Sequence, residues 1–279
     1  MRLGNLDGRG VLAVEGGAID IAEATGGRIG PDLQSCIEAF AELAELAPTL
    51  TGPVLELDET RMGPPSPKPG QIIAIGMNYR EHAREMNLVL PEIPAAFAKF
   101  RSALTGPYGD ITLPSGHCDH EVEMVLVIGR TTESVTLDNA WSFVAGVTAG
   151  EDISDREVQM AAGRQFALGK SFPGFAPIGP WIVSTDEIED LSNIPLGCAV
   201  DGVVVQDAHT SDMVFAVPEL LTALCAIITL EPGDIIFTGS PAGAGSSATP
   251  QRFLNPGEML TTWVGTSGEM RHRLVAPTS

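Results

Sequence analysis

Cysteine, positive charge and long apolar runs are all scarce in this sequence of 279 residues. The four cysteines are far apart and form no CxxC pair, so neither a disulfide framework nor a zinc knuckle is indicated. They are Cys36, Cys118, Cys198 and Cys225. No segment reaches the roughly 18 apolar residues that span a bilayer, and the first residues lack a signal-peptide core. We therefore expect a soluble, unexported protein of the reducing cytoplasm.

The shortage of positive charge leaves a strongly acidic chain. Lys and Arg total 16 against 36 Asp and Glu, so the net charge is −20 and the pI is near 4.4. Such a charge disfavours nucleic acid and anionic membranes as partners. A small anionic ligand would also be repelled, unless a bound cation and a few Lys or Arg side chains inverted the field inside its pocket. An acidic surface that aids solubility accounts for most of the charge in either case.

The chain is predicted to divide at a short linker. Residues 1–62 alternate short apolar runs with glycines, and Pro31 then opens a segment with apolar side chains at helical spacing. Residues 63–70, GPPSPKPG, are too rich in Pro and Gly for regular structure. We expect a small N-terminal strand and helix domain at 1–62, a linker at 63–70 and a large domain at 71–279, which the 44% hydrophobic content can supply with a core.

The large domain is predicted to be β-rich. Short apolar runs bounded by turn residues favour strands at Ile72–Ile75, Val122–Ile128, Val144–Val147, Trp181–Val183, Val203–Val205 and Ile235–Thr238. One helix is expected from about Pro218, with Leu220, Leu221, Leu224, Ile227 and Ile228 as a single apolar stripe. Because regular helices do not separate the strands, an α+β fold is favoured over a doubly wound sheet.

Two acids, Glu121 and Glu123, lie two residues apart in a segment that otherwise suits a strand. Side chains alternate along a strand, so both point to the same face and repel unless a cation lies between them. A third acid, Asp152, follows another expected strand and can reach the same ion. Three oxygen ligands without sulfur suit Mg²⁺, Mn²⁺ or Ca²⁺. On spacing alone, a solvent-facing strand with acidic outward positions explains the pattern equally well.

A zinc site is the rival interpretation of the same region. His117, Cys118 and His120 are potential zinc ligands within four positions. Successive residues of an extended chain point in opposite directions, so His117 and Cys118 can hardly converge, and a fourth ligand is not evident. We therefore favour a hard cation on the three carboxylates.

Longer motifs surround the three acids. They are IIAIGMNYREHAREM (Ile72–Met86), AFAKFRSALTG (Ala96–Gly106), DISDREVQ (Asp152–Gln159), LGKSFPGFAPIGPW (Leu168–Trp181) and TLEPGDIIFTGSPAGAG (Thr229–Gly245). Together with Glu121, Glu123 and Asp152, their order and spacing across residues 70–258 resemble the fumarylacetoacetate hydrolase family. The closest resemblance is to its acylpyruvate hydrolase and 2-hydroxyhepta-2,4-diene-1,7-dioate isomerase-like branch.

The resemblance implies a mixed β-sandwich roll with a small N-terminal domain, commonly assembled as a homodimer. It implies Mg²⁺, with Mn²⁺ or Ca²⁺ as alternatives, held by Glu121, Glu123 and Asp152. It further implies that the catalytic groups are His82, Glu85 and Lys170. Substrate-binding roles fall to Gln159, Ser240, Tyr79, Lys99 and Arg156. Departures from the family pattern at Met77, Pro173, Met270 and His272 concern the substrate rather than the metal.

The implied reaction is hydrolysis of a carbon–carbon bond in a small 2,4-diketo acid, which releases pyruvate and a carboxylic acid. His82 would act as the general base, because its ordinary pKa of about 6.5 lies near operating pH, and Glu85 would orient it. Decarboxylation of oxaloacetate, or isomerisation or decarboxylation of 2-hydroxyhepta-2,4-diene-1,7-dioate, would use the same metal site. A silent ligand-binding relative is disfavoured, because all the implied catalytic groups are present. The glycines of GSPAGAG suit a loop that approaches a ligand carboxylate better than a nucleotide site, since no helix-forming run follows them.

Overall fold

The structure is a computed structural model that describes residues 1–161, 163 and 165–278. Its largest sheet follows the order β3 (Gly17–Asp20), β2 (Arg9–Val14), β1 (Arg2–Leu6), β13 (Ala176–Val183), β11 (Val144–Glu151), β10 (Val122–Ile128), β16 (Ile235–Phe237), β5 (Ile72–Gly76) and β6 (Ala95–Ala98). The short strands β4 (Met62–Gly63) and β7 (Leu104–Thr105) pair with β1 and β13. The expected strands of the large domain lie within or overlap these strands and β15 (Val203–His209) of a second sheet.

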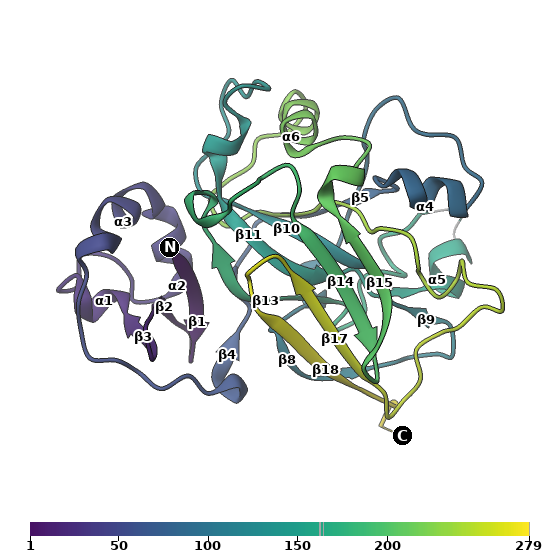
Figure 1. Cartoon of the computed structure of the whole chain (residues 1–279), viewed down its shortest axis with the longest axis horizontal. Coiled ribbons are helices and arrows are strands. Elements are labelled where there is room, and N and C mark those ends of the chain that lie inside the picture. The colour runs from purple at the N-terminus through teal and green to yellow at the C-terminus, as the bar shows by residue number, and fades with distance from the viewer. Residues whose placement is uncertain (162, 164, 279) are drawn as a thin grey trace.

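A second sheet packs across the centre of the first (Figure 1). Its order is β15 (Val203–His209), β14 (Pro195–Val200), β17 (Met259–Val264), β18 (Glu269–Val275) and β8 (Tyr108–Thr112). β9 (Cys118–Asp119) and β12 (Ser154–Asp155) form a separate antiparallel pair. Every residue of β10 and β11 is buried, because both faces of these central strands are covered. The β-rich α+β class and the layered-sheet architecture are therefore confirmed.

The helices are short and lie around the sheets. They are α1 (Ile21–Ala24), α2 (Leu33–Glu38), α3 (Phe40–Leu46), α4 (Arg80–Glu85), α5 (Arg156–Ala161) and α6 (Val217–Cys225). Single 3₁₀ turns occur at Ala47–Thr49, Glu59–Arg61, Arg101–Ala103, Ala140–Phe143, Thr185–Glu187 and Thr210–Asp212. None of the helices in the described part of the chain is both long and apolar enough to span a bilayer.

Helix α6 begins as the sequence predicts but ends earlier. Pro218 lies in its first turn, and Leu220, Leu221 and Leu224 form its buried face. The helix ends at Cys225, and Ile227 lies beyond it with 86% of its surface exposed. The prediction that Ile227 belongs to the apolar stripe is therefore wrong, because the chain leaves the helical path before that residue.

The N-terminal residues extend the main sheet at one side of the molecule (Figure 1). β1 pairs antiparallel with β13, with Leu3 opposite Ile182, so strands from residues 1–62 continue the hydrogen-bond ladder of the larger part. The expected N-terminal helix is split into α2 and α3 at Ala39. Residues 64–70 carry no helix or strand, in keeping with their Pro-rich composition. The division into domains at 62 and 71 stays a prediction.

Candidate active site

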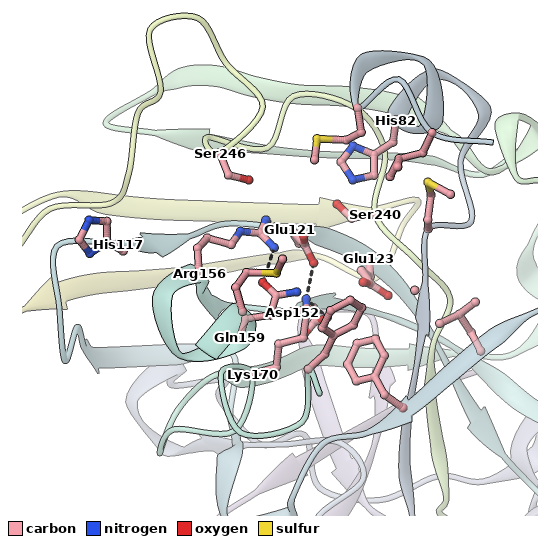
Figure 2. Close-up of a pocket in the computed structure, with 18 of the residues that line it drawn as sticks. His82, His117, Glu121, Glu123, Asp152, Arg156, Gln159, Lys170, Ser240 and Ser246 are labelled. Carbon is pink, nitrogen blue, oxygen red and sulfur yellow. Dashed lines mark hydrogen bonds and ion pairs between the residues drawn. The ribbon is translucent and has the colours of Figure 1, made fainter. Parts of the chain in front are cut away.

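A cavity of about 680 Å³ opens beside the ends of β10 and β11 (Figure 2). Charged and polar side chains line one wall, among them Glu121, Glu123, Asp152, Lys170, Gln159 and Ser240. Apolar side chains line much of the remainder, among them Met77, Met86, Leu88, Phe97, Phe166 and Phe253. The cavity is thus divided between a polar wall at the ends of the buried central strands and an apolar wall carried mainly by loops.

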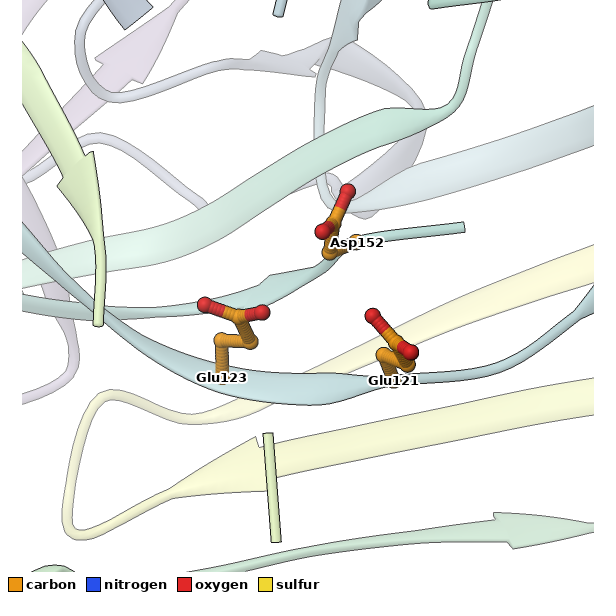
Figure 3. A group of neighbouring side chains, drawn as sticks. All are labelled: Glu121, Glu123 and Asp152. Atoms are coloured by element: carbon orange, nitrogen blue, oxygen red, sulfur yellow. The ribbon is translucent and has the colours of Figure 1, made fainter. Parts of the chain in front are cut away.

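The three acids meet at the polar wall (Figure 3). Glu123 lies on β10, Glu121 precedes that strand, and Asp152 follows β11. The antiparallel pairing of β10 and β11 brings these ends together, and the Asp152 amide donates to the Glu121 carbonyl at 2.9 Å. One carboxylate oxygen from each acid lies within 4.8 Å of the others, and all three residues are buried. Strand alternation and register therefore produce the convergence that the sequence predicts.

Two lysines contact two of these carboxylates. The Lys170 ammonium lies 2.6 Å from Glu121 Oε2 and 2.5 Å from Asp152 Oδ2. The Lys99 ammonium lies 2.5 Å from Asp152 Oδ1 and also donates to the Lys170 carbonyl. Burial lowers the pKa of Lys99, whereas at Lys170 the carboxylates of Asp152 and Glu121 outweigh burial and raise the pKa. Lys170 is therefore held as a cation at the polar wall.

Arg156, at the start of α5, holds the outer edge of the carboxylate group. Its guanidinium donates to Glu121 Oε1 at 2.6 Å, to Asp119 Oδ2 at 2.7 Å and to Gln159 Oε1 at 3.0 Å. Burial alone would raise the pKa of Glu121, but Arg156 and Lys170 reverse this and lower it. Glu121 is therefore ionised, and most of the hydrogen-bonding capacity of Arg156 is used inside the protein.

Glu123 has a different environment. Among the described residues its hydrogen-bond partner is the amide of Gly239, which donates to Oε2 at 2.6 Å. Burial, followed by the charges of Asp152 and Glu121, raises the pKa of Glu123 well above its usual range. Gly239 adopts a φ of +101°, and a Cβ there would lie 2.6 Å from the Cβ of Asn78. Only glycine therefore suits the turn that brings this amide to Glu123.

This set of ligands fits a hard divalent cation. The donors are three buried carboxylates, and Glu123 has no cationic partner of its own in the described chain. An ion held by all three acids would take over contacts that Lys170 now makes with Glu121 and Asp152. The rival zinc ligands do not come together: His117 is exposed and pairs with Glu157 at 3.3 Å, while buried Cys118 donates to the Ser115 carbonyl at 3.5 Å.

His82 and Glu85 lie on α4, and His82 lines the cavity across from the carboxylates (Figure 2). His82 Nδ1 lies 3.1 Å from Glu85 Oε2, as an i, i+3 pair on a helix allows. Glu85 also accepts a long hydrogen bond of 3.3 Å from the Gly243 amide. If Nδ1 carries the proton donated to Glu85, Nε2 of His82 is left as an acceptor for a proton from the cavity.

Two of the predicted substrate-binding residues do not line the cavity. Lys99 lies behind Asp152, with its ammonium fully buried. Tyr79 precedes α4 and is also fully buried, and burial raises the pKa of its phenol. The other three, Gln159, Ser240 and Arg156, do line it. Direct substrate contact by Lys99 and Tyr79 stays a prediction that this geometry does not support.

Asp119 and Glu151 are buried acids next to the site that sequence reasoning missed. Asp119 accepts from the Gly245 amide at 2.7 Å and the Ser246 amide at 3.0 Å, in addition to Arg156. It therefore ties the glycine-rich loop to the carboxylate group. Glu151 accepts from the Glu121 amide at 2.9 Å, and burial raises its pKa to about 8. Asp119 continues the every-second-residue pattern of Glu121 and Glu123, which is a signal that could have identified it.

Comparisons with known proteins agree on one family. Residues 71–275 match the family model described as fumarylacetoacetate (FAA) hydrolase C-terminal. The chain is 39% identical over 226 residues to the mitochondrial oxaloacetate tautomerase FAHD2A of Bos taurus, covering 80% of this chain and 72% of that one. It is also 39% identical over 241 residues to the 2,4-didehydro-3-deoxy-L-rhamnonate hydrolase of Sphingomonas sp. (strain SKA58), covering 85% and 84%.

Two solved structures extend the likeness to the whole fold. A putative HpcE protein from Mycobacterium smegmatis superposes with a TM-score of 0.95 at 43% identity, and the match covers 100% of both chains. The maleylpyruvate hydrolase from Sphingobium sp. SYK-6, solved in complex with manganese (II) ion and pyruvate, has a TM-score of 0.80 at 29% identity, again over 100% of both chains.

Proposed function

The chain belongs to the fumarylacetoacetate hydrolase family, a family of enzymes, and on that premise we propose that it hydrolyses an acylpyruvate in a divalent-metal-dependent reaction. The substrate is a small 2,4-diketo acid, R–CO–CH₂–CO–COO⁻. Water adds to the carbonyl that carries R, the bond from that carbon to CH₂ breaks, and pyruvate and R–COOH are released. We propose Mg²⁺ as the ion, with Mn²⁺ or Ca²⁺ as alternatives, and a cytoplasmic homodimer as the working form.

One observation carries this proposal: three buried carboxylates that suit a metal ion face His82 across a cavity with an apolar wall, and His82 is paired with Glu85 on the same helix. When bound by Glu121, Glu123 and Asp152, the cation would polarise the keto group next to the substrate carboxylate. The apolar wall offers space for the R group. Tautomerisation of a substrate as small and polar as oxaloacetate would make little use of that wall.

The side chains on the two walls divide the remaining tasks. His82 accepts a proton from water through Nε2, and Glu85 holds the imidazole and stabilises its charged form. Lys170, kept cationic by its carboxylate neighbours, balances negative charge that develops on a substrate oxygen. Gln159 lines the same wall, and its side-chain oxygen accepts a hydrogen bond from Arg156. Its side-chain NH₂ group is therefore the part available to donate to a substrate.

A second candidate follows from the relatives. The chain is 39% identical both to an oxaloacetate tautomerase and to the 2,4-didehydro-3-deoxy-L-rhamnonate hydrolase. Keto–enol exchange would need a polarised keto group but no attack by water. Oxaloacetate tautomerisation or decarboxylation, or isomerisation of 2-hydroxyhepta-2,4-diene-1,7-dioate, is therefore the alternative on the same carboxylates. Each would leave the apolar wall without an assigned role.

The two candidates separate in one assay of purified protein with Mg²⁺. Acetylpyruvate, longer acylpyruvates, fumarylpyruvate and oxaloacetate are supplied in parallel, with pyruvate release and loss of oxaloacetate enol followed separately. We expect pyruvate release from acylpyruvates, fastest with a longer R group. Enol loss from oxaloacetate with no pyruvate from any acylpyruvate would replace the leading proposal by the alternative.

A further inference from the structure

Gln206 is the buried residue of an edge strand that is otherwise open to solvent. It is 2% exposed, whereas Val203 and Val204 on the same strand, β15, are 67% and 55% exposed. The pairing register of β14 and β15 shifts at this point and leaves Val205 as an extra residue, which is a β-bulge. Bulges turn a side chain in a new direction, and they occur often at sheet edges and beside active sites.

The side-chain amide of Gln206 uses all of its hydrogen-bonding capacity. Oε1 accepts from the Val122 amide at 2.9 Å and from Cys198 Sγ at 3.3 Å. Nε2 donates to Ser240 Oγ at 2.9 Å and to the Pro241 carbonyl at 2.8 Å. A backbone N–H can only donate, and a carbonyl can only accept, so the two ends of the amide cannot be exchanged. The orientation of Gln206 is therefore determined by its neighbours.

This orientation decides what the Ser240 hydroxyl can do. Its oxygen already accepts a hydrogen bond from Gln206 Nε2, and its own proton has no acceptor among the described residues. Ser240 lines the cavity and lies between His82 and Glu123 in Figure 2. Gln206 occupies one of the two lone pairs of this oxygen, and the unused hydroxyl proton suits Ser240 to a hydrogen-bond acceptor such as a carboxylate oxygen.

We infer that Gln206 is a positioning residue that fixes Ser240 as a hydrogen-bond donor to the substrate carboxylate. The inference rests on the proposed function in taking that substrate to be a keto acid. Gln206 comes from the second sheet and also holds the Val122 amide, which lies between Glu121 and Glu123. One side chain thus links the Ser240 loop to the start of β10, while β10 itself is held by its pairing with β11 and β16.

A double-mutant cycle on oxalate binding tests this inference. Binding of oxalate to the Mg²⁺-loaded protein is measured by calorimetry for wild type, Gln206→Met, Ser240→Ala and the double variant. A lost hydrogen bond to a charged ligand should weaken each single variant about 10-fold or more. The double variant should bind no more weakly than Ser240→Ala, because Gln206 acts through Ser240. Losses that multiply in the double variant would overturn the inference.

Three further variants separate positioning from general damage. In a Ser240→Thr background, which keeps the hydroxyl, Gln206→Met should again weaken oxalate binding about 10-fold. Asn5→Leu removes another buried amide, far from the cavity, where Asn5 donates to the Pro64 carbonyl at 3.0 Å. It should lower thermal stability and leave oxalate affinity unchanged. Gln206→Met should leave the affinity for Mg²⁺ alone unaltered. A loss of Mg²⁺ affinity as large as the loss of oxalate affinity would contradict a role through Ser240.

A crystal structure of the wild type with oxalate and Mg²⁺ gives an answer even if Gln206→Met does not fold. Ser240 Oγ should lie within hydrogen-bond distance of both Gln206 Nε2 and an oxalate oxygen. An oxalate that contacts neither Ser240 nor its loop would overturn the inference. Oxalate is not turned over, so this binding test does not depend on the reaction. If the double-mutant cycle behaves as expected but no acylpyruvate releases pyruvate, the proposed function is rejected and the role of Gln206 is kept.

Discussion

The two walls of the cavity are built in opposite ways. The polar wall lies on and beside the central strands β10 and β11. Its carboxylates are buried, and those of Glu121 and Asp152 are paired with Lys170, Lys99 and Arg156. The apolar wall is carried by several separate segments, among them the loop after α4, where Leu88 is half exposed. The difference indicates a division of labour. A rigid, charge-compensated wall suits steps shared by many keto acids, whereas an exposed apolar wall suits selection among R groups.

The largest effect should come from removing the ion or one of its ligands at the polar wall. We expect excess chelator to abolish all turnover, and Mg²⁺ to restore it. Glu123→Gln and Asp152→Asn should each lower Mg²⁺ affinity at least about a hundredfold, since the loss of an outer partner alone costs about 10 to 100-fold. Calorimetry with Mg²⁺ measures this. Full activity in chelator would mean that the polar wall works without a metal.

His82→Ala should have the next largest effect, and it tests whether α4 takes part in chemistry. Loss of a general base should lower kcat for acylpyruvate hydrolysis by about 10² to 10⁴-fold. Mg²⁺ affinity should not change, because His82 does not contact the carboxylates. Any oxaloacetate decarboxylation should survive much better, since it needs no prepared water. Near wild-type hydrolysis would remove His82 from the mechanism and leave α4 with a purely binding role.

Leu88→Ala tests the apolar wall with a smaller expected effect. Partial loss of an apolar contact of about 1 kcal/mol should lower kcat/KM for a long-chain acylpyruvate by about fivefold, with little change for acetylpyruvate. The neighbouring Val89, which is 91% exposed and does not line the cavity, provides the matched control. Equal effects of Leu88→Ala and Val89→Ala on both substrates would show that this wall does not select the R group.

The sequence predicts the groups that local periodicity places together, but not those that depend on contacts between distant segments. Glu121 and Glu123 follow from strand alternation, and Asp152 follows from the end of the next strand, so local periodicity is sufficient to propose the group. Gln206 could not be proposed in this way, because its partners Val122 and Ser240 are 84 and 34 residues away in the chain. Such contacts depend on how two sheets pack, which local pattern does not encode.

Other differences have similar physical causes. Motif matching gives the residue types near a site but not which side of the wall they occupy, and Lys99 lies behind Asp152 for that reason. The end of α6 at Cys225 was missed because Ile227 and Ile228 continue the apolar composition after the helical path has ended. Each predicted strand overlaps an observed one, because each contains a short apolar run between turn residues. The observed β11, β13 and β15 extend several residues beyond the predicted ranges.

The smallest expected effect concerns His272, in the second sheet, away from both walls. Burial lowers its pKa to about 4, although Nε2 lies 3.0 Å from the Gly106 carbonyl. The unfolded chain binds this proton near pH 6.5 and the folded chain does not, so the folded state loses stability as the pH falls from about 6.5 towards 4.

As the pH falls from 7.5 to 6, we expect His272 to lower the free energy of unfolding by about 1 kcal/mol. Urea titration at both pH values measures this change. His272→Gln should abolish that part of the pH dependence, whereas the same substitution at exposed His209 should leave it in place. Because His272 does not line the cavity, activity at saturating substrate should be the same for wild type and His272→Gln. A change in kcat would show that the second sheet supports the chemistry as well as the fold.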